Sequence, residues 1–148
     1  MTLESIISEK SVVLLETTEM EDTINIMIDK ALDLGKIKSK EEFLEAILER
    51  EEIVSTGIGL GVAIPHAKLK SIDNFFIILG LTKSGLDWDA IDRKPVKAVF
   101  LIGGPENKQQ EYLKIVSRIM LLVKNNEKRE ILFNENSYDQ IKEIFSNF

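Results

Sequence analysis

The stretch Ser55-Thr-Gly-Ile-Gly-Leu-Gly-Val-Ala-Ile-Pro-His-Ala67 organises the chain and contains its single histidine, His66. Glycines at every second position let its backbone turn and approach other groups closely: Gly57, Gly59 and Gly61. The apolar run 62–64 predicts a short buried strand, which Pro65 ends because proline has no N–H to donate. We therefore expect His66 at a fixed point just past a strand end, where a neutral imidazole can act as a nucleophile near pH 7.

Length and composition predict one globular domain, residues 1–148, because 44% hydrophobic residues in a chain of this size can bury a full core. There is no cysteine, which excludes disulfides and thiolate metal sites and fits a reducing cytoplasm. Neither a signal peptide nor a membrane-spanning run is recognised, so we expect a cytoplasmic protein without direct membrane insertion. The net charge of −6 argues against nucleic acid as the main partner and suits a partner with a positive docking patch.

The first third of the chain predicts one short helix, one strand and two longer helices, at 3–8, 11–16, 18–35 and 39–50. Each longer helix opens on a capping box, Thr18–Glu21 and Ser39–Glu42, in which a hydroxyl and a carboxylate bond the free amides of the first turn. Gly35 is expected to end the first of them, and the second runs into Arg50.

The remaining two thirds predict strands and then helices. The expected strands are 75–81, 86–88 after a turn at Lys83–Gly85, and 96–102, closed by Gly103–Pro105; the expected helices are 108–124, 128–133 and one after a capping box at Ser137–Gln140. Five residues are expected to face inward on the long helix: Leu113, Val116, Ile119, Met120 and Val123. The fold class is therefore α/β, a single domain with a small mixed sheet flanked by helices on its faces.

The quoted stretch, with Arg50 sixteen residues before the histidine and Asp89-Ala-Ile-Asp-Arg-Lys-Pro-Val96 downstream, resembles the type-2 enzyme IIA domain of the bacterial phosphotransferase system. That family includes fructose, mannitol and nitrogen-regulatory branches, and the resemblance extends over nearly the whole chain. It implies that His66 takes a phosphoryl group from the phosphohistidine of HPr and that Arg50 stabilises it. Sugar-transport members then pass the group to an EIIB partner, and no cofactor or metal is implied.

The residue types suit this chemistry. A phosphoryl group in transfer carries its charge on three oxygens, and the planar, permanently charged guanidinium of Arg50 can hold two of them. The hydroxyls of Ser55 and Thr56 and the backbone from Gly57 onward are candidate further donors. Some relatives carry a second histidine at the start of the long helix, where this chain has Tyr112. Tyrosine can donate a hydrogen bond but adds no positive charge, so the group is expected to depend more on Arg50.

Other interpretations of these residues are weaker. A lone histidine is more often an ordinary surface or core residue, and Arg50 would otherwise belong to a solvated helix end. The alternating glycines lack the G-x-G-x-x-G spacing and precede a strand, which excludes a dinucleotide site. The acidic residues of 87–92 lack the glycine and closing glutamate of a calcium loop, so a solvated turn is expected there.

Two functions fit the resemblance, and a third is weaker. The preferred one is a phosphocarrier in sugar uptake, with HPr and EIIB as partners. The alternative is a nitrogen-regulatory module that binds regulatory target proteins according to the phosphorylation of His66. The weaker one is a relative that has lost phosphotransfer and only binds a partner, which the presence of both Arg50 and His66 disfavours.

Overall fold

A mixed β-sheet of six strands forms the centre of the computed structural model, which describes residues 2–135 and 137–148. The strands lie in the order β1 (Val12–Leu14), β5 (Phe76–Leu86), β6 (Val96–Pro105), β3 (Val62–Ala63) and β2 (Gly57–Gly59), and β4 (His66–Leu69) also pairs with β6. Pairing is parallel for β1–β5, β3–β6 and β4–β6, and antiparallel for β5–β6 and β2–β3. The predicted mixed sheet is therefore confirmed.

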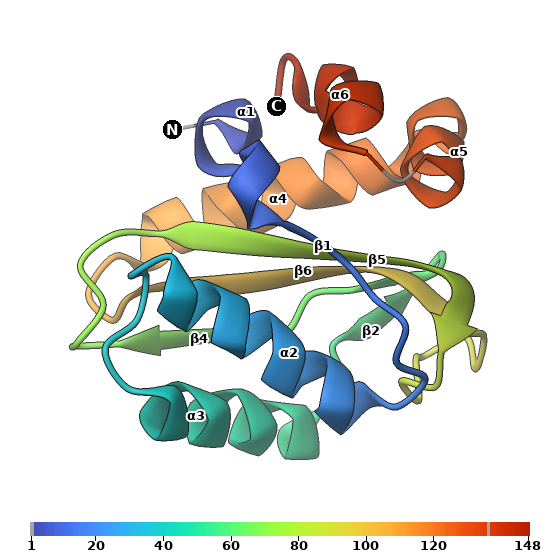
Figure 1. Cartoon of the computed structure of the whole chain (residues 1–148). Helices are drawn as coiled ribbons and strands as arrows, with labels where there is room; N and C mark the ends of the chain where they lie inside the picture. The colour runs from blue at the N-terminus through green and yellow to red at the C-terminus, as the bar shows by residue number, and fades with distance from the viewer. Residues whose placement is uncertain (1, 136) are drawn as a thin grey trace.

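Helices cover both faces of this sheet (Figure 1). One face carries α2 (Met20–Asp33) and α3 (Lys40–Ile53); the other carries α1 (Leu3–Ile6), α4 (Gln109–Lys124), α5 (Asn126–Asn134), α6 (Tyr138–Ile141) and the 3-10 turn Lys142–Phe145. A second 3-10 turn, Glu9–Ser11, precedes β1. Across the described residues, no helix has both the length and the apolar character needed to cross a bilayer.

The two central strands divide their side chains between two hydrophobic cores. In β5, Ile77 and Leu79 pack under α4, whereas Phe76 and Ile78 pack toward α2 and α3. Successive side chains of a strand point to opposite faces, and here both faces are covered. This explains why the sequence of β5 begins as an unbroken apolar run instead of alternating with polar residues.

The predicted capping boxes have mixed outcomes at the start of the two long N-terminal helices. Ser39 caps α3, since its Oγ accepts from the Glu42 N–H at 3.2 Å, but the Glu42 carboxylate accepts from Ser71 instead of closing the box. The box at Thr18 is wrong: α2 begins after Glu19, because the Thr18 carbonyl is held by the Asp87 N–H at 2.9 Å.

Gly35 follows the C-terminus of α2 in a left-handed conformation, φ 71°, so its predicted role in ending the helix is confirmed.

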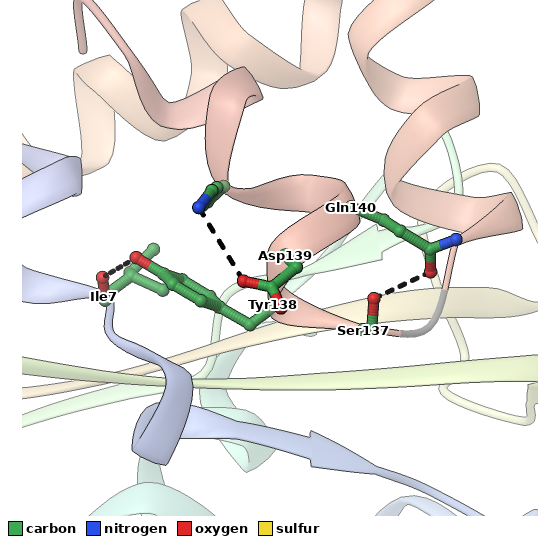
Figure 2. Close-up of polar contacts among 6 residues, drawn as sticks. Ile7, Ser137, Tyr138, Asp139 and Gln140 are labelled. Carbon is green, nitrogen blue, oxygen red and sulfur yellow. Dashed lines mark hydrogen bonds and ion pairs between the residues drawn. The ribbon is translucent and has the colours of Figure 1, made fainter.

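The C-terminal helix is fixed by side-chain contacts of a different kind from the predicted box (Figure 2). Ser137 Oγ donates to the Gln140 side-chain oxygen at 2.8 Å and accepts no backbone N–H. The Tyr138 hydroxyl donates to the backbone carbonyl of Ile7 at 3.4 Å. These contacts tie α6 to the chain just after α1, and the two ends of the chain pack on the same face of the sheet.

Strand β5 corrects the predicted turn at residues 83–85. The strand runs on through Lys83 and Ser84 to Leu86, and it absorbs the irregularity as a register shift against β6 with Gly85 at φ 88°. Its antiparallel partner is β6, and no separate strand returns at 86–88. The predicted closing segment Gly103–Pro105 is likewise the last part of β6, paired with β4.

Helix α4 buries a different stripe from the predicted one. Its buried residues are Tyr112, Ile115, Ile119, Leu122 and Val123. Leu113, which was expected inward, is 54% exposed, and Val116 and Met120 are only partly buried. Both stripes have helical spacing in this leucine- and isoleucine-rich segment, so periodicity alone could not choose between them.

Candidate functional site

A cleft of about 430 Å³ lies between the last turns of α3, strand β4 and the first turn of α4. Helix α3 contributes Arg50, β4 contributes His66 and Lys68, and α4 contributes Gln109 and Tyr112. Figure 1 shows α3 and α4 on opposite faces of the sheet, so residues from both layers converge here. Three predicted site residues, His66, Arg50 and Tyr112, are thus brought to one cleft from three separate elements.

His66 is the first residue of β4, directly after a break in the sheet. Strands β3 and β4 both pair parallel with β6, and the break between them lies at Ile64–Pro65. The His66 Nδ1 lies 3.0 Å from the carbonyl oxygen of Ile64. A carbonyl oxygen can only accept, so Nδ1 carries the proton and Nε2 keeps its lone pair.

The environment of His66 keeps the imidazole neutral. Burial lowers its pKa below the usual 6.5, and the positive charges of Arg50 and Lys68 lower the pKa further. The hydrogen bond to Ile64 and the Glu51 carboxylate act in the opposite direction without reversing the result. At pH 7 the only histidine in the chain is therefore mostly neutral, with Nε2 unprotonated.

Arg50 lies in the last turn of α3 and is exposed. A cation at a helix C-terminus is favoured by the helix dipole, which helps to explain its position. Within residues 2–135 and 137–148, its guanidinium forms no ion pair; the ion pairs present are Lys40–Asp29 and Lys142–Asp139. The charge of Arg50 in the cleft is therefore not neutralised by a carboxylate.

Tyr112 packs on the imidazole of His66, with ring centroids 5.0 Å apart and planes tilted by 40°. Burial raises the pKa of Tyr112 to about 12, although Arg50 acts in the opposite direction. Its hydroxyl therefore stays a neutral hydrogen-bond donor across the physiological range. Tyr112 also contacts Lys68, whose Nζ lies 4.7 Å from the Tyr112 ring centroid.

Ser55, Thr56 and Gly57 do not line this cleft. The Glu51 carboxylate accepts from the Thr56 N–H at 2.8 Å, from its hydroxyl at 2.6 Å, and from Trp88 Nε1 at 3.1 Å. The Ser55 hydroxyl accepts from the Gly57 N–H at 3.1 Å. These hydrogen bonds hold the end of α3 against β2 and against the segment around Trp88. Ser55, Thr56 and Gly57 can therefore affect a ligand of His66 only indirectly, by positioning the end of α3.

Close packing against Ala90 explains why residue 57 is a glycine. A Cβ there would lie 2.8 Å from the Cα of Ala90, so the backbone of β2 approaches this segment as only glycine allows.

The other two glycines serve the hairpin between β2 and β3. Its central residues, Leu60 and Gly61, both have positive φ, 59° and 76°, as a two-residue type I′ turn requires. The Asp92 carboxylate accepts from the Leu60 N–H at 3.2 Å and from the Lys94 N–H at 3.0 Å. Asp92 is thereby engaged with backbone, and no group of three or more potential metal ligands occurs in the described part of the chain.

Lys68 and Gln109 line the cleft but were not identified from the sequence. Strand alternation could have indicated Lys68, because residues two apart lie on the same face of a strand. Gln109 and Glu51 carried no such signal, since their roles depend on which elements meet in three dimensions.

A family model described as "Phosphoenolpyruvate-dependent sugar phosphotransferase system, EIIA 2" matches residues 5–148. The "PTS system fructose-specific EIIABC component" of Bacillus subtilis is 37% identical over 89% of this chain, which spans about a fifth (21%) of that protein's length. The "PTS system fructose-specific EIIA component" of Haloferax volcanii is 31% identical over 85% of this chain and 82% of its own.

Solved structures share the arrangement. The nitrogen regulatory protein IIA-Ntr of Neisseria meningitidis superposes with a TM-score of 0.90 at 25% identity, over 97% of this chain and 99% of that one. The complex of enzyme IIAMtl with phosphorylated enzyme IIBMtl from Escherichia coli contains a chain that matches with a TM-score of 0.81 at 14% identity, over 96% of this chain and 98% of that one. The second likeness shows the fold alone.

Proposed function

Since the chain belongs to the type 2 EIIA family of the phosphoenolpyruvate-dependent sugar phosphotransferase system, we propose that His66 accepts a phosphoryl group from phospho-HPr and passes it to an EIIB component during sugar uptake. Family membership makes the chain a phosphotransfer component of that system. The proposal adds the accepting residue, the donor and the next acceptor, and places the relay in the cytoplasm.

The observation that carries the proposal is the contact between His66 Nδ1 and the Ile64 carbonyl at 3.0 Å. It fixes the tautomer in which Nε2 has the lone pair, while burial and the neighbouring cations lower the pKa of the ring. A nucleophile for phosphoryl transfer needs such a nitrogen, unprotonated at neutral pH and held in one orientation.

The proposed step needs only groups that the two proteins supply. The bond between phosphorus and the donor's imidazole nitrogen breaks, its electron pair stays on that nitrogen, and the Nε2 lone pair of His66 forms the new bond to phosphorus. No proton has to leave Nε2, so no general base is required. The guanidinium of Arg50 lies in the same cleft and supports the proposal as the group that stabilises the phosphoryl oxygens. Tyr112 is proposed as a neutral donor beside it.

The proposed acceptor rests on the name of one relative. The name of the Bacillus subtilis relative, EIIABC, joins the A, B and C components in one protein. By analogy, an EIIB protein is the proposed recipient of the phosphoryl group from His66.

The test is the intact mass of the protein after incubation with phosphoenolpyruvate, enzyme I and HPr. Wild type is expected to gain one acid-labile phosphoryl group, His66→Ala to gain none, and Arg50→Ala to gain it more slowly. The phosphorylated protein is then mixed with candidate EIIB proteins, and loss of the group to one of them identifies the acceptor. An unphosphorylated wild type beside a working HPr control would refute the proposal.

A regulatory role is the second candidate function, and the structural similarity to IIA-Ntr of Neisseria meningitidis supports it. In this role phosphorylation of His66 controls binding to target proteins, and no EIIB accepts the group. Affinity capture with His66→Ala and with the phosphorylated wild type is expected to recover different partners only in the regulatory case.

A further inference from the structure

We propose that Lys68 is a second phosphoryl-binding residue beside Arg50, held ready for that role by Tyr112 and Gln109. This inference rests on the proposed function, because it assigns a further residue to the same phosphoryl transfer. It adds a second positive charge to a site that was expected to depend more on Arg50 because tyrosine stands in place of a second histidine.

Strand geometry places the Lys68 side chain with that of His66. The two residues are two positions apart in β4, so both side chains project from the same face, and both line the cleft. Their strand pairs in regular register with β6, His66 opposite Ile102 and Lys68 opposite Gly104. The separation of the two side chains is therefore set by the sheet and does not depend on a mobile loop.

Two neutral groups hold the Lys68 ammonium in the cleft. It donates a hydrogen bond to the Gln109 side-chain oxygen and lies over the Tyr112 ring, 4.7 Å from the centroid. The same ring packs on His66, with centroids 5.0 Å apart. Tyr112 thus contacts both side chains, the Lys68 ammonium and the His66 imidazole.

In the described residues, no carboxylate neutralises the Lys68 ammonium, which is therefore free to bind an anion. Although Glu49 and Glu106 also line the cleft, no ion pair joins Lys68 to either carboxylate or to any other acid in the described residues. A cation held by an amide oxygen and an aromatic face is stabilised without being neutralised. Lys68 and Arg50 together therefore present two uncompensated positive charges around the imidazole, from β4 and from α3.

A phosphoryl group on Nε2 would attract the ammonium more strongly than its present contacts do. Its oxygens carry full negative charge, whereas Gln109 offers a neutral carbonyl and Tyr112 the face of a ring. A lysine side chain has four rotatable bonds, so Nζ can move from Gln109 toward the phosphoryl oxygens without displacing β4. Lys68 makes and breaks no covalent bond in this role and transfers no proton.

The experiment compares four proteins: wild type, Lys68→Met, Lys68→Arg and Lys70→Met. Methionine keeps the length and packing of the lysine stem, arginine keeps the charge, and Lys70 is an exposed residue just beyond β4, so its variant matches the change in net charge. Circular dichroism and thermal unfolding first confirm that all four proteins are folded.

The first readout is the rate of phosphoryl transfer from phospho-HPr to His66. Lys68→Met is expected to lower this rate about tenfold, the low end for losing a hydrogen bond to a charged group, because Lys68 is half-buried. Lys68→Arg is expected to recover most of the rate, and Lys70→Met to stay within about twofold of wild type, as a screened surface charge should.

The second readout needs no phosphoryl group. The chain has one histidine, so its imidazole protons can be followed by NMR as the pH changes. Because the Lys68 charge disfavours the imidazolium, Lys68→Met is expected to raise the pKa of His66, whereas Lys70→Met is expected to leave the titration near that of wild type.

The outcomes distinguish a failure of the proposed role of Lys68 from a failure of the proposed phosphocarrier function. If wild type takes no phosphoryl group, the proposed function is wrong and the role of Lys68 is wrong with it. If wild type is phosphorylated and Lys68→Met transfers as fast as Lys70→Met, only the role of Lys68 is overturned. A slow Lys68→Met that Lys68→Arg does not restore also overturns it, since the lysine then acts through packing and not through charge.

Discussion

Removal of the Glu51 carboxylate is expected to destabilise the protein by about 3 kcal/mol. The carboxylate accepts three hydrogen bonds, from the Thr56 N–H, the Thr56 hydroxyl and Trp88 Nε1. Hydrogen bonds to charged groups contribute about 1.5–3 kcal/mol each, and buried donors left without partners add to the loss. Two features reduce the sum: Glu51 is half-exposed, and Trp88 Nε1 keeps a second acceptor, the Thr56 hydroxyl at 3.3 Å.

Urea unfolding followed by tryptophan fluorescence measures this change directly. Trp88 is the only tryptophan, is 2% exposed and belongs to the network itself. For a domain of this size, about 3 kcal/mol corresponds to a fall in melting temperature of roughly 6–12 °C. Glu52→Ala is the matched control, because Glu52 is the exposed neighbour in the same helix and its loss changes the net charge equally.

A second variant separates charge from hydrogen bonding. Glu51→Gln keeps one oxygen to accept from Trp88 and from the Thr56 N–H, but its amide group must donate where the other oxygen accepted the Thr56 hydroxyl. We expect a loss of about 1 kcal/mol, between those of Glu52→Ala and Glu51→Ala. If Glu51→Ala unfolds within about 0.5 kcal/mol of Glu52→Ala, the network does not hold the end of α3 and the reasoning is wrong.

Three further predictions concern pH, glycine packing and the face of α4. Because the pKa of His66 lies below 6.5 and the neutral form is the proposed nucleophile, the rate of phosphoryl acceptance is expected to stay level from pH 8 to 6.5 and to fall only at lower pH, as a pH–rate profile will show. Gly103→Ala would place a Cβ 2.4 Å from the Phe76 ring and is expected to destabilise by about 1–3 kcal/mol, whereas Gly35→Ala, with open space but positive φ, should cost about 1 kcal/mol in urea unfolding. Ile115→Ala is expected to cost about 2–5 kcal/mol and Leu113→Ala less than about 0.5, a contrast that a reversed helix face would invert.

Arg50 and Tyr112, which meet His66 in the cleft, were predicted from the family resemblance. Local sequence signals were enough to predict the sheet and most helices. Each of these depends on a pattern within a short stretch, such as the apolar run that forms β5 or the serine that caps α3. The predicted turn at 83–85 was wrong because tertiary pairing overrode the local signal. Its residues favour a turn locally, but pairing with β6 continues on both sides of the irregularity, and the sheet holds the segment extended.

The rest of the site could not be predicted because it depends on contacts between elements distant in the sequence. Gln109 meets Lys68 only because the first turn of α4 lies beside β4, and Glu51 meets Trp88 only because α3 ends against the segment before β6. The apolar spacing of α4 is compatible with two buried stripes. Packing against the sheet determines that the stripe containing Tyr112 is the buried one. The sequence therefore indicated which residues meet in the cleft better than which residues support them.

The break at Ile64–Pro65 lies directly before His66, the proposed nucleophile, and helps to orient its side chain. Proline has no N–H, so regular pairing with β6 cannot continue through this point. The Ile64 N–H donates instead to the Thr56 carbonyl at 2.9 Å, whereas the Pro65 carbonyl already accepts from the Ile102 N–H of β6 at 2.9 Å. The Ile64 carbonyl is left to accept from His66 Nδ1. This carbonyl selects the tautomer, and regular pairing resumes at once in β4, which fixes His66 and Lys68 on one face.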